Sequence, residues 1–202
     1  LLLTKMKTID SLLKTRNSLS NRIEALDSGE LDTESIHSLN KVISEINLQI
    51  EKLEKECDII VNTYFREEKE LLSTIPGIGK VCTNVILAHY EGFKNFDSAR
   101  QAASFVGITP NEYSSGTSVH KKSRISKCGS AYVRNKLFMG ALSAMRNNKS
   151  CRELYDRLIS RHKSKKQALI AVAHKLLRQA FSVLKNKRMY DENYIDERFA
   201  VK

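Results

Sequence analysis

The sequence predicts a mainly α protein, in which a long antiparallel coiled-coil hairpin precedes a compact helical domain. Residues 36–64 carry apolar side chains at alternating spacings of three and four, the pattern of a coiled coil when it is sustained over several heptads. Residues 165–187 carry a second apolar stripe of helical period. The chain has no strand-rich segment and no internal repeat, so helices dominate the prediction.

Two long helices are expected first, over residues 3–26 and 33–64. A polar turn separates them, and Asp32 or Thr33 caps the second helix. The apolar positions of the second helix are Ile36, Leu39, Ile43, Ile46, Ile50, Leu53, Cys57, Ile60 and Tyr64. The two helices either fold back on each other or pair with another protomer. The segment 1–70 is therefore interpreted as a helical spacer or as a dimerisation arm, and a homo-oligomer formed through it is expected.

Five shorter helices are predicted for the compact domain, residues 71–190. They cover residues 81–90, 98–106, 130–145, 152–160 and 165–187. Asp97 caps the second of them, Gly107 ends it, and Ser130 caps the third. The core face of the last helix is Leu169, Val172, Ala173, Leu176, Ala180 and Leu184. The segments without a helical pattern are a loop at 110–117, a weakly extended stretch at 118–126 and a tail at 191–202.

The basic residues gather in one part of the chain, whose formal charge is +11 and whose pI is about 9.5. Residues 113–188 hold 19 Lys and Arg against 2 Asp and Glu, whereas residues 1–70 hold 10 against 14. A folded basic surface indicates a polyanionic partner, which is DNA or RNA. No apolar run reaches about 18 residues, so no membrane partner is expected.

No metal is expected in this chain. The four cysteines form no C-x-x-C pair, which argues against zinc and against a disulfide framework and predicts reduced thiols; they are Cys57, Cys82, Cys128 and Cys151. Glu153 and Asp156 are the only carboxylates in the basic segment. They are interpreted as structural, because two carboxylates without a convergent partner do not form a two-metal site.

The stretch from Ile75 to Lys80 reads Ile-Pro-Gly-Ile-Gly-Lys and lies between two helical patterns. A tight turn there exposes backbone N–H groups at the start of the next helix, where the helix dipole favours an anion. Gly77, Gly79 and Lys80 are therefore candidate contacts to a nucleic-acid phosphate. The turn resembles a helix-hairpin-helix, a module that holds a DNA backbone without reading its sequence. The alternative is an ordinary turn between helices that needs its glycines.

Two adjacent serines form a second candidate site. Ser114 and Ser115 lie between a Gly-Ile-Thr-Pro turn at residues 107–110 and an Ile-Ser-Lys motif at residues 125–127. The cations that are candidate ligands of a scissile phosphate are Lys121, Lys122, Arg124, Lys127 and Arg134. A lone serine hydroxyl is a poor nucleophile, so local chemistry leaves open whether the serines react or are loop residues. His120 is a candidate base.

A third basic cluster, Lys163, Lys165 and Lys166, lies at the start of the last helix. Cations are disfavoured at a helix N-terminus, and a phosphate partner would offset that cost. These lysines are therefore candidate DNA or RNA contacts, with a solvated helix start as the alternative.

The order of these motifs resembles the C-terminal half of the IS "one-ten" family of transposases, which includes the pilin-gene inverting recombinases. The shared order is a Pro-Gly-Ile-Gly turn, a G-[IL]-T-P turn, Ser-Gly, and I-S-K-x-G-x-x-x-[VL]-R, and it runs from about residue 71 to residue 181. The preceding helical hairpin fits the central coiled coil of the family. Several separated motifs agree in order and spacing, which makes the resemblance specific.

The resemblance implies a chemistry and a set of partners. In the family, a serine directly before a glycine attacks a DNA phosphodiester and forms a covalent phosphoserine link; that position here is Ser115, with Ser114 as the alternative. A structured "bridge" RNA pairs with target and donor DNA, and an N-terminal RuvC-like domain, not expected in this chain, holds Mg²⁺. The chain is expected at the nucleoid of a prokaryotic cytoplasm and inactive alone. The rival hypothesis is a non-catalytic nucleic-acid-binding module with a coiled-coil dimerisation arm.

Overall fold

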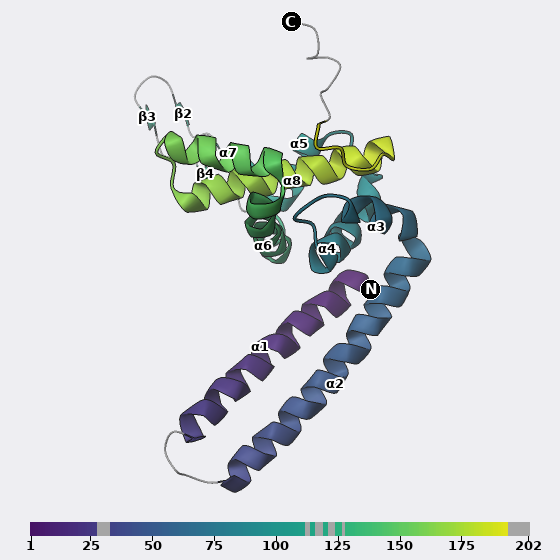
Figure 1. Ribbon diagram of the computed structural model, residues 1–202, viewed down its shortest axis with the longest axis vertical. Helices are drawn as coiled ribbons and strands as arrows, with labels where there is room; N and C mark the ends of the chain where they lie inside the picture. Colours follow the sequence, from purple (N-terminus) through teal and green to yellow (C-terminus); the bar gives the residue numbers. More distant parts are fainter. Residues whose placement is uncertain (28–32, 112–113, 116–118, 121–123, 127, 194–202) are drawn as a thin grey trace, which may run out of the picture. The chain divides into compact units, whose positions relative to one another are not determined.

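The structure, a computed structural model, describes residues 1–27, 33–111, 114–115, 119–120, 124–126 and 128–193. It confirms the mainly helical fold class (Figure 1). The chain divides into two units, Leu1–Tyr64 and Phe65–Lys202. Each helix in the described ranges is too short or too polar to span a bilayer.

The first unit consists of two antiparallel helices, α1 (Leu2–Asp27) and α2 (Thr33–Tyr64) (Figure 1). Near the start of α1, Lys5 forms an ion pair with Glu56 of α2. Its hydrogen bond to the carboxylate lowers the pKa of Glu56, because the bond favours the charged form. The two helices therefore pack along their length in a defined register.

The predicted apolar stripe of α2 is buried or half-buried up to residue 60, but the prediction is wrong at Tyr64, which is 72% exposed. Arg16 Nη1 donates to Asn47 Oδ1 at 3.4 Å, a second contact between the two helices. Tyr64 is the last residue of α2 and of the first unit, so it lies at the end of the apolar stripe rather than within it.

The second unit contains six α-helices and one short 3-10 helix in its described part. They are α3 (Arg66–Ser73), α4 (Lys80–Tyr90), η1 (Glu91–Phe93), α5 (Ala99–Val106), α6 (Ala131–Asn147), α7 (Lys149–Ser160) and α8 (Lys165–Asn186). Four strands of two residues lie between α5 and α6: β1 (Pro110–Asn111), β2 (Ser114–Ser115), β3 (Val119–His120) and β4 (Arg124–Ile125). They pair antiparallel as β1 with β4 and β2 with β3.

Helix α8 is the centre of this unit, because α3, α5, α6 and α7 all pack against it. The apolar face predicted for it is confirmed; its six residues are buried. Ser164 starts the helix with a capping box, in which its hydroxyl accepts from the Gln167 N–H and the Gln167 side chain reaches back. Phe181 of α8 meets Phe93 with ring centroids 5.3 Å apart, and Phe93 meets Tyr90 at 4.7 Å. The aromatic cluster thus joins α8 to the end of α4.

Two local predictions are wrong. The stretch 110–117 is predicted to be a loop, yet β1 and β2 lie in it, because strands of two residues are too short to leave an alternating pattern in the sequence. The cap of α5 is Ser98 and not Asp97: the Ser98 hydroxyl accepts from the Gln101 N–H. The predicted end of this helix at Gly107 (φ 74°) and the Ser130 cap of α6 are confirmed.

Candidate nucleic-acid interface

The turn between α3 and α4 uses its two glycines differently. Gly77 has φ 101°, and a Cβ at this position would overlap the backbone of Ala144 in α6. Ile75 and Ile78, on either side, are buried. Gly77 is therefore required by the fold itself, because it lets the turn lie directly on α6.

Gly79 has no such constraint. Its φ is −86°, which other residues adopt, and a Cβ added there would meet no atom within 4 Å. It is exposed, as is Lys80 beside it, and as the N-cap of α4 it offers no side-chain cap to the first N–H groups of the helix. The backbone at the start of α4 is thus open to an incoming anion, and a glycine allows the closest approach.

A polar network holds the same turn from behind. Asn148, which is fully buried, donates from Nδ2 to Pro76 O at 3.3 Å and to Gln179 Oε1 at 3.1 Å. Its Oδ1 accepts from the Tyr190 hydroxyl at 3.3 Å. The Tyr190 N–H donates to Thr74 Oγ1 at 2.9 Å. The turn is therefore fixed to α7, α8 and the segment after α8 through hydrogen bonds.

The serine pair lies on β2, in a backbone ladder with β3. Ser114 is opposite His120, and Ser115 is opposite Val119. Farther toward the helices, Pro110 of β1 pairs with Ile125 of β4, and Ser126 N donates to Thr109 O at 3.1 Å. These ladders form a hairpin, which we call the serine hairpin and which comprises residues 108–128.

The base of the serine hairpin is clasped to α5 and α6. The chain enters it through Gly107 (φ 74°) and leaves it through Gly129 (φ 110°). A Cβ on Gly107 would overlap the backbone oxygen of Cys128, and a Cβ on Gly129 would overlap the backbone oxygen of Phe105. Arg134 Nη1 donates to Val106 O at 3.0 Å and to Gly129 O at 3.1 Å. This guanidinium therefore joins the two ends of the hairpin.

The remaining predicted phosphate ligands of this site divide into two groups. Arg124 lies in β4, where its backbone pairs with Asn111. Lys121, Lys122 and Lys127 lie outside the described residues.

Helix α6 separates the turn from the serine hairpin. The hairpin is clasped at the start of α6, next to Ser130, and Gly77 lies on Ala144 near its end. From Ser130 to Ala144 an α-helix rises about 21 Å. The turn and the base of the serine hairpin thus contact opposite ends of α6.

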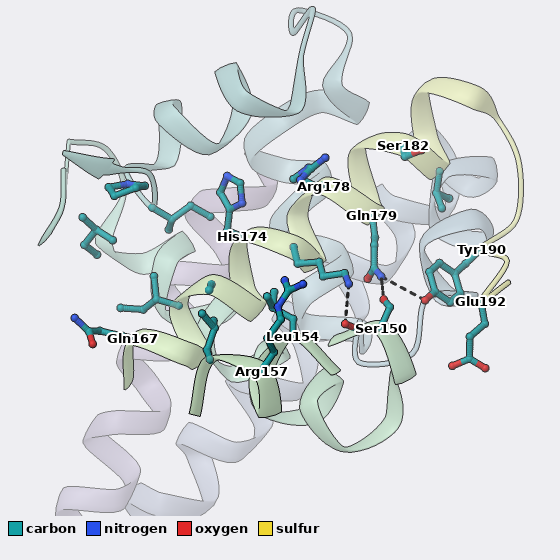
Figure 2. Close-up of a pocket in the computed structure, with 18 of the residues that line it drawn as sticks. Ser150, Leu154, Arg157, Gln167, His174, Arg178, Gln179, Ser182, Tyr190 and Glu192 are labelled. Carbon is teal, nitrogen blue, oxygen red and sulfur yellow. Dashed lines mark hydrogen bonds between the residues drawn. The ribbon is translucent and has the colours of Figure 1, made fainter. Parts of the chain in front are cut away.

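The third predicted cluster borders a groove of about 1760 Å³ along α8 (Figure 2). We call it the α7–α8 groove; its walls come from α7, α8, the base of the serine hairpin and residues 188–192. Lys163 and Lys166 line it, whereas Lys165 is exposed outside it. The cations that line it are Arg157, Lys163, Lys166, Lys175, Arg178 and Arg188.

Sequence reasoning missed four of these cations, Arg157, Lys175, Arg178 and Arg188. A signal existed for two of them, because Lys175 and Arg178 are three residues apart on the polar side of the apolar stripe of α8. Figure 2 shows Arg157 and Leu154 of α7 across from His174 and Arg178 of α8, with Gln167 toward one end and Tyr190 and Glu192 toward the other. Burial and the nearby Arg178 lower the pKa of His174, so its imidazole is neutral at pH 7.

Residues 69–156 match the model of the transposase IS116/IS110/IS902 family. The pilin gene-inverting protein of Moraxella bovis is 35% identical over 123 residues, which are 60% of this chain and 38% of that protein. The insertion element IS110 uncharacterized 43.6 kDa protein of Streptomyces coelicolor is 26% identical over 156 residues, 77% of this chain and 38% of that protein. The transposase for insertion sequence element IS1111A of Coxiella burnetii is 25% identical over 127 residues, 61% of this chain and 35% of that protein.

These matches indicate the class: the chain is similar to part of the IS110-type transposases. The match to the IS116/IS110/IS902 family model and the similarity to these relatives support the resemblance seen in the motif order. The matched segment contains the α3–α4 turn, the serine hairpin and Arg134. The chain spans less than half the length of each of these relatives.

Proposed function

We propose that this chain is the DNA-binding and nucleophile-bearing part of a transposase that moves an insertion sequence through a covalent phosphoserine intermediate. The observation that carries the proposal is the serine hairpin: the Ser114–Ser115 pair lies on a short ladder whose base is clasped to two helices, inside the family-matched segment. A nucleophile needs a defined position relative to the phosphate that it attacks. A clasped hairpin supplies such a position.

In the proposed step, Ser115 Oγ forms a bond to the phosphorus of a DNA phosphodiester and one bridging P–O bond breaks. The hydroxyl proton passes to a base, and the departing sugar oxygen takes up a proton. The number of phosphoester bonds does not change in this step. A DNA hydroxyl can therefore attack the phosphoserine in the reverse reaction, which rejoins the strand and releases the serine. Lys121, Lys122, Arg124 and Lys127 are proposed to stabilise the charge that develops on the phosphate.

Ser114 remains the alternative nucleophile. The backbone register puts Ser114 opposite His120 and Ser115 opposite Val119. If His120 acts as the base, the register therefore favours Ser114, whereas the family motif favours the serine directly before Gly116. The two serines form a matched pair for mutation.

The α3–α4 turn is proposed to grip a DNA backbone in the manner of a helix-hairpin-helix, through Gly79, Lys80 and the first N–H groups of α4. The open backbone at Gly79 supports this assignment. The turn is proposed to position DNA for the chemistry at the serine hairpin without taking part in it. Arg134 is proposed to act on the serine hairpin rather than on phosphate.

Further partners follow from the family. We assign guide RNA, Mg²⁺ in an N-terminal RuvC-like domain, and self-association through α1 and α2 as a coiled coil to the complete transposase. No three His, Cys, Asp or Glu side chains gather into a metal site in the part of the chain that the structure describes. No step is assigned to a metal held by this part of the chain.

The test is a covalent adduct. The complete transposase is incubated with its guide RNA and a labelled DNA substrate, denatured, and examined for a protein–DNA link by electrophoresis and peptide mass spectrometry. Ser115→Ala is expected to abolish the link and Ser114→Ala to retain it. An adduct that survives Ser115→Ala but not Ser114→Ala moves the assignment to Ser114. Salt-dependent DNA binding without an adduct in any variant favours the non-catalytic module.

A further inference from the structure

The α7–α8 groove has the charge of a nucleic-acid site, and the base of the serine hairpin forms part of its wall. Six cations line it against two carboxylates, Asp191 and Glu192. Both carboxylates lie at one end, and Glu192 Oε1 accepts from the Lys149 N–H at the start of α7. The rest of the groove is therefore cationic. Helix α8, which forms one whole side, lies beyond the segment 69–156 that matches the family model.

The cations stand at the rim, and some are held in place. Arg157 and Arg178 are exposed on the facing helices α7 and α8. Lys175 is half-buried between them, and its Nζ donates to Ser150 O at 2.7 Å. A long groove with cations on both walls matches a phosphate backbone that runs along it. From Lys166 to Asn186 helix α8 rises about 30 Å, which accommodates several nucleotides.

The bed of the groove is apolar. Leu154 and Leu158 of α7 and Ile170 and Ala171 of α8 are half-buried there, and Ile108 at the base of the serine hairpin is buried. A DNA duplex offers phosphates and sugars to such a surface and keeps its base faces stacked inside. An unpaired strand can turn the apolar faces of its bases onto the aliphatic bed while its phosphates meet the rim. The neutral imidazole of His174 adds one aromatic face in the groove.

We infer that the α7–α8 groove binds an unpaired segment of nucleic acid, with bases on the apolar bed and phosphates on Arg157, Lys175 and Arg178. The inference rests on the proposed function in one respect only, which is that the ligand is a nucleic acid. It adds a site for single strands that is distinct from the α3–α4 turn and from Ser115. RNA and DNA share the chemistry that the groove recognises, and the experiment compares them.

The experiment measures binding of the 202-residue chain by fluorescence anisotropy. The probes are a labelled oligothymidylate and a labelled oligouridylate of about 12 nucleotides, and a labelled duplex of equal length. The variant Arg157→Glu/Arg178→Glu reverses two charges in the groove. The control Lys94→Glu/Arg100→Glu makes the same charge change at two exposed cations outside it. Helical circular dichroism verifies the fold of each.

The groove variant is expected to weaken single-strand binding about tenfold or more, and duplex binding by no more than the control does. Ile170→Ser, which removes part of the bed without changing charge, is expected to weaken single strands and leave the duplex unchanged. Tighter binding of the oligothymidylate would identify the ligand as DNA, and tighter binding of the oligouridylate would identify it as RNA. Equal losses for duplex and single strands, or equal losses in groove variant and control, would overturn the inference. Ser115→Ala is expected to bind both strands normally, so failure of the adduct test and failure here are distinguishable.

Discussion

The two glycines of the α3–α4 turn give the sharpest test of how the structure divides fold from function. Gly77→Ala is expected to destabilise the protein. A left-handed backbone costs a residue with a Cβ about 1–2 kcal/mol. The added Cβ overlaps the backbone of Ala144, and overpacking of this kind costs about 1–3 kcal/mol. The free energy of unfolding should therefore fall by roughly 2–5 kcal/mol.

Gly79→Ala is the matched control, because its φ of −86° suits alanine and its Cβ meets no atom within 4 Å. Its free energy of unfolding should change by less than about 1 kcal/mol. Duplex DNA affinity should nevertheless fall about tenfold or more, since the Cβ separates a phosphate from the N–H groups that bond it.

Thermal unfolding followed by circular dichroism measures the first effect. For a chain of this size, a loss of roughly 2–5 kcal/mol lowers Tm by about 5–20 °C. Anisotropy with labelled duplex measures the second effect. A Gly77→Ala protein that melts with the wild type would refute the packing argument. A Gly79→Ala protein with normal duplex affinity would refute the assignment of the turn to phosphate binding.

Three further predictions follow from the hydrogen bonds and pKa shifts. Arg134→Lys keeps the charge but replaces the planar guanidinium, whose Nη1 donates to both carbonyls, with a shorter side chain that ends in an ammonium. It should therefore lower the free energy of unfolding by about 1–3 kcal/mol and speed proteolysis of the serine hairpin. Unchanged stability would point to a phosphate ligand instead. Burial lowers the pKa of His174, so the unfolded state binds a proton at this residue before the folded state does as pH falls below about 6.5. The free energy of unfolding measured in urea should therefore drop more between pH 7 and pH 5 for the wild type than for His174→Gln. Equal drops in the two proteins would contradict this. Burial raises the pKa of Cys82 to about 12 and that of Cys151 to about 11. Iodoacetamide at pH 8 should therefore label the exposed Cys128 first, as followed by mass spectrometry. Equal labelling rates would contradict the burial of Cys82 and Cys151.

The helices could be predicted from the sequence because their signals are local. The stripe of α8 repeats at helical spacing, and Ser130 and Gly107 are residues that cap and end helices wherever they lie. The failures came where a distant segment decides. Tyr64 continues the apolar pattern of α2 but is exposed, because an apolar period does not say which of its positions another segment covers.

The candidate site was predictable in part for the same reason. A glycine in a turn indicates an unusual backbone conformation or a close approach. The amino-acid sequence does not say whether a helix or a ligand occupies the space beside that glycine. Gly77 and Gly79 are one residue apart, yet they differ in backbone φ and in what lies beside them. The α7–α8 groove joins residues from α7, α8 and the serine hairpin, and no spacing in the sequence indicates that they face one another.

The clasp changes how the motif around Ile125-Ser126-Lys127 is interpreted. Two of its fixed residues, Gly129 and Arg134, act on the backbone: the glycine permits the close crossing with Phe105, and the arginine bonds both ends of the hairpin. A motif that follows a nucleophile in this way need not hold substrate. It can fix the base from which a short ladder carries Ser115, and any change at Gly129 or Arg134 would then alter the nucleophile's position without removing a group that touches DNA.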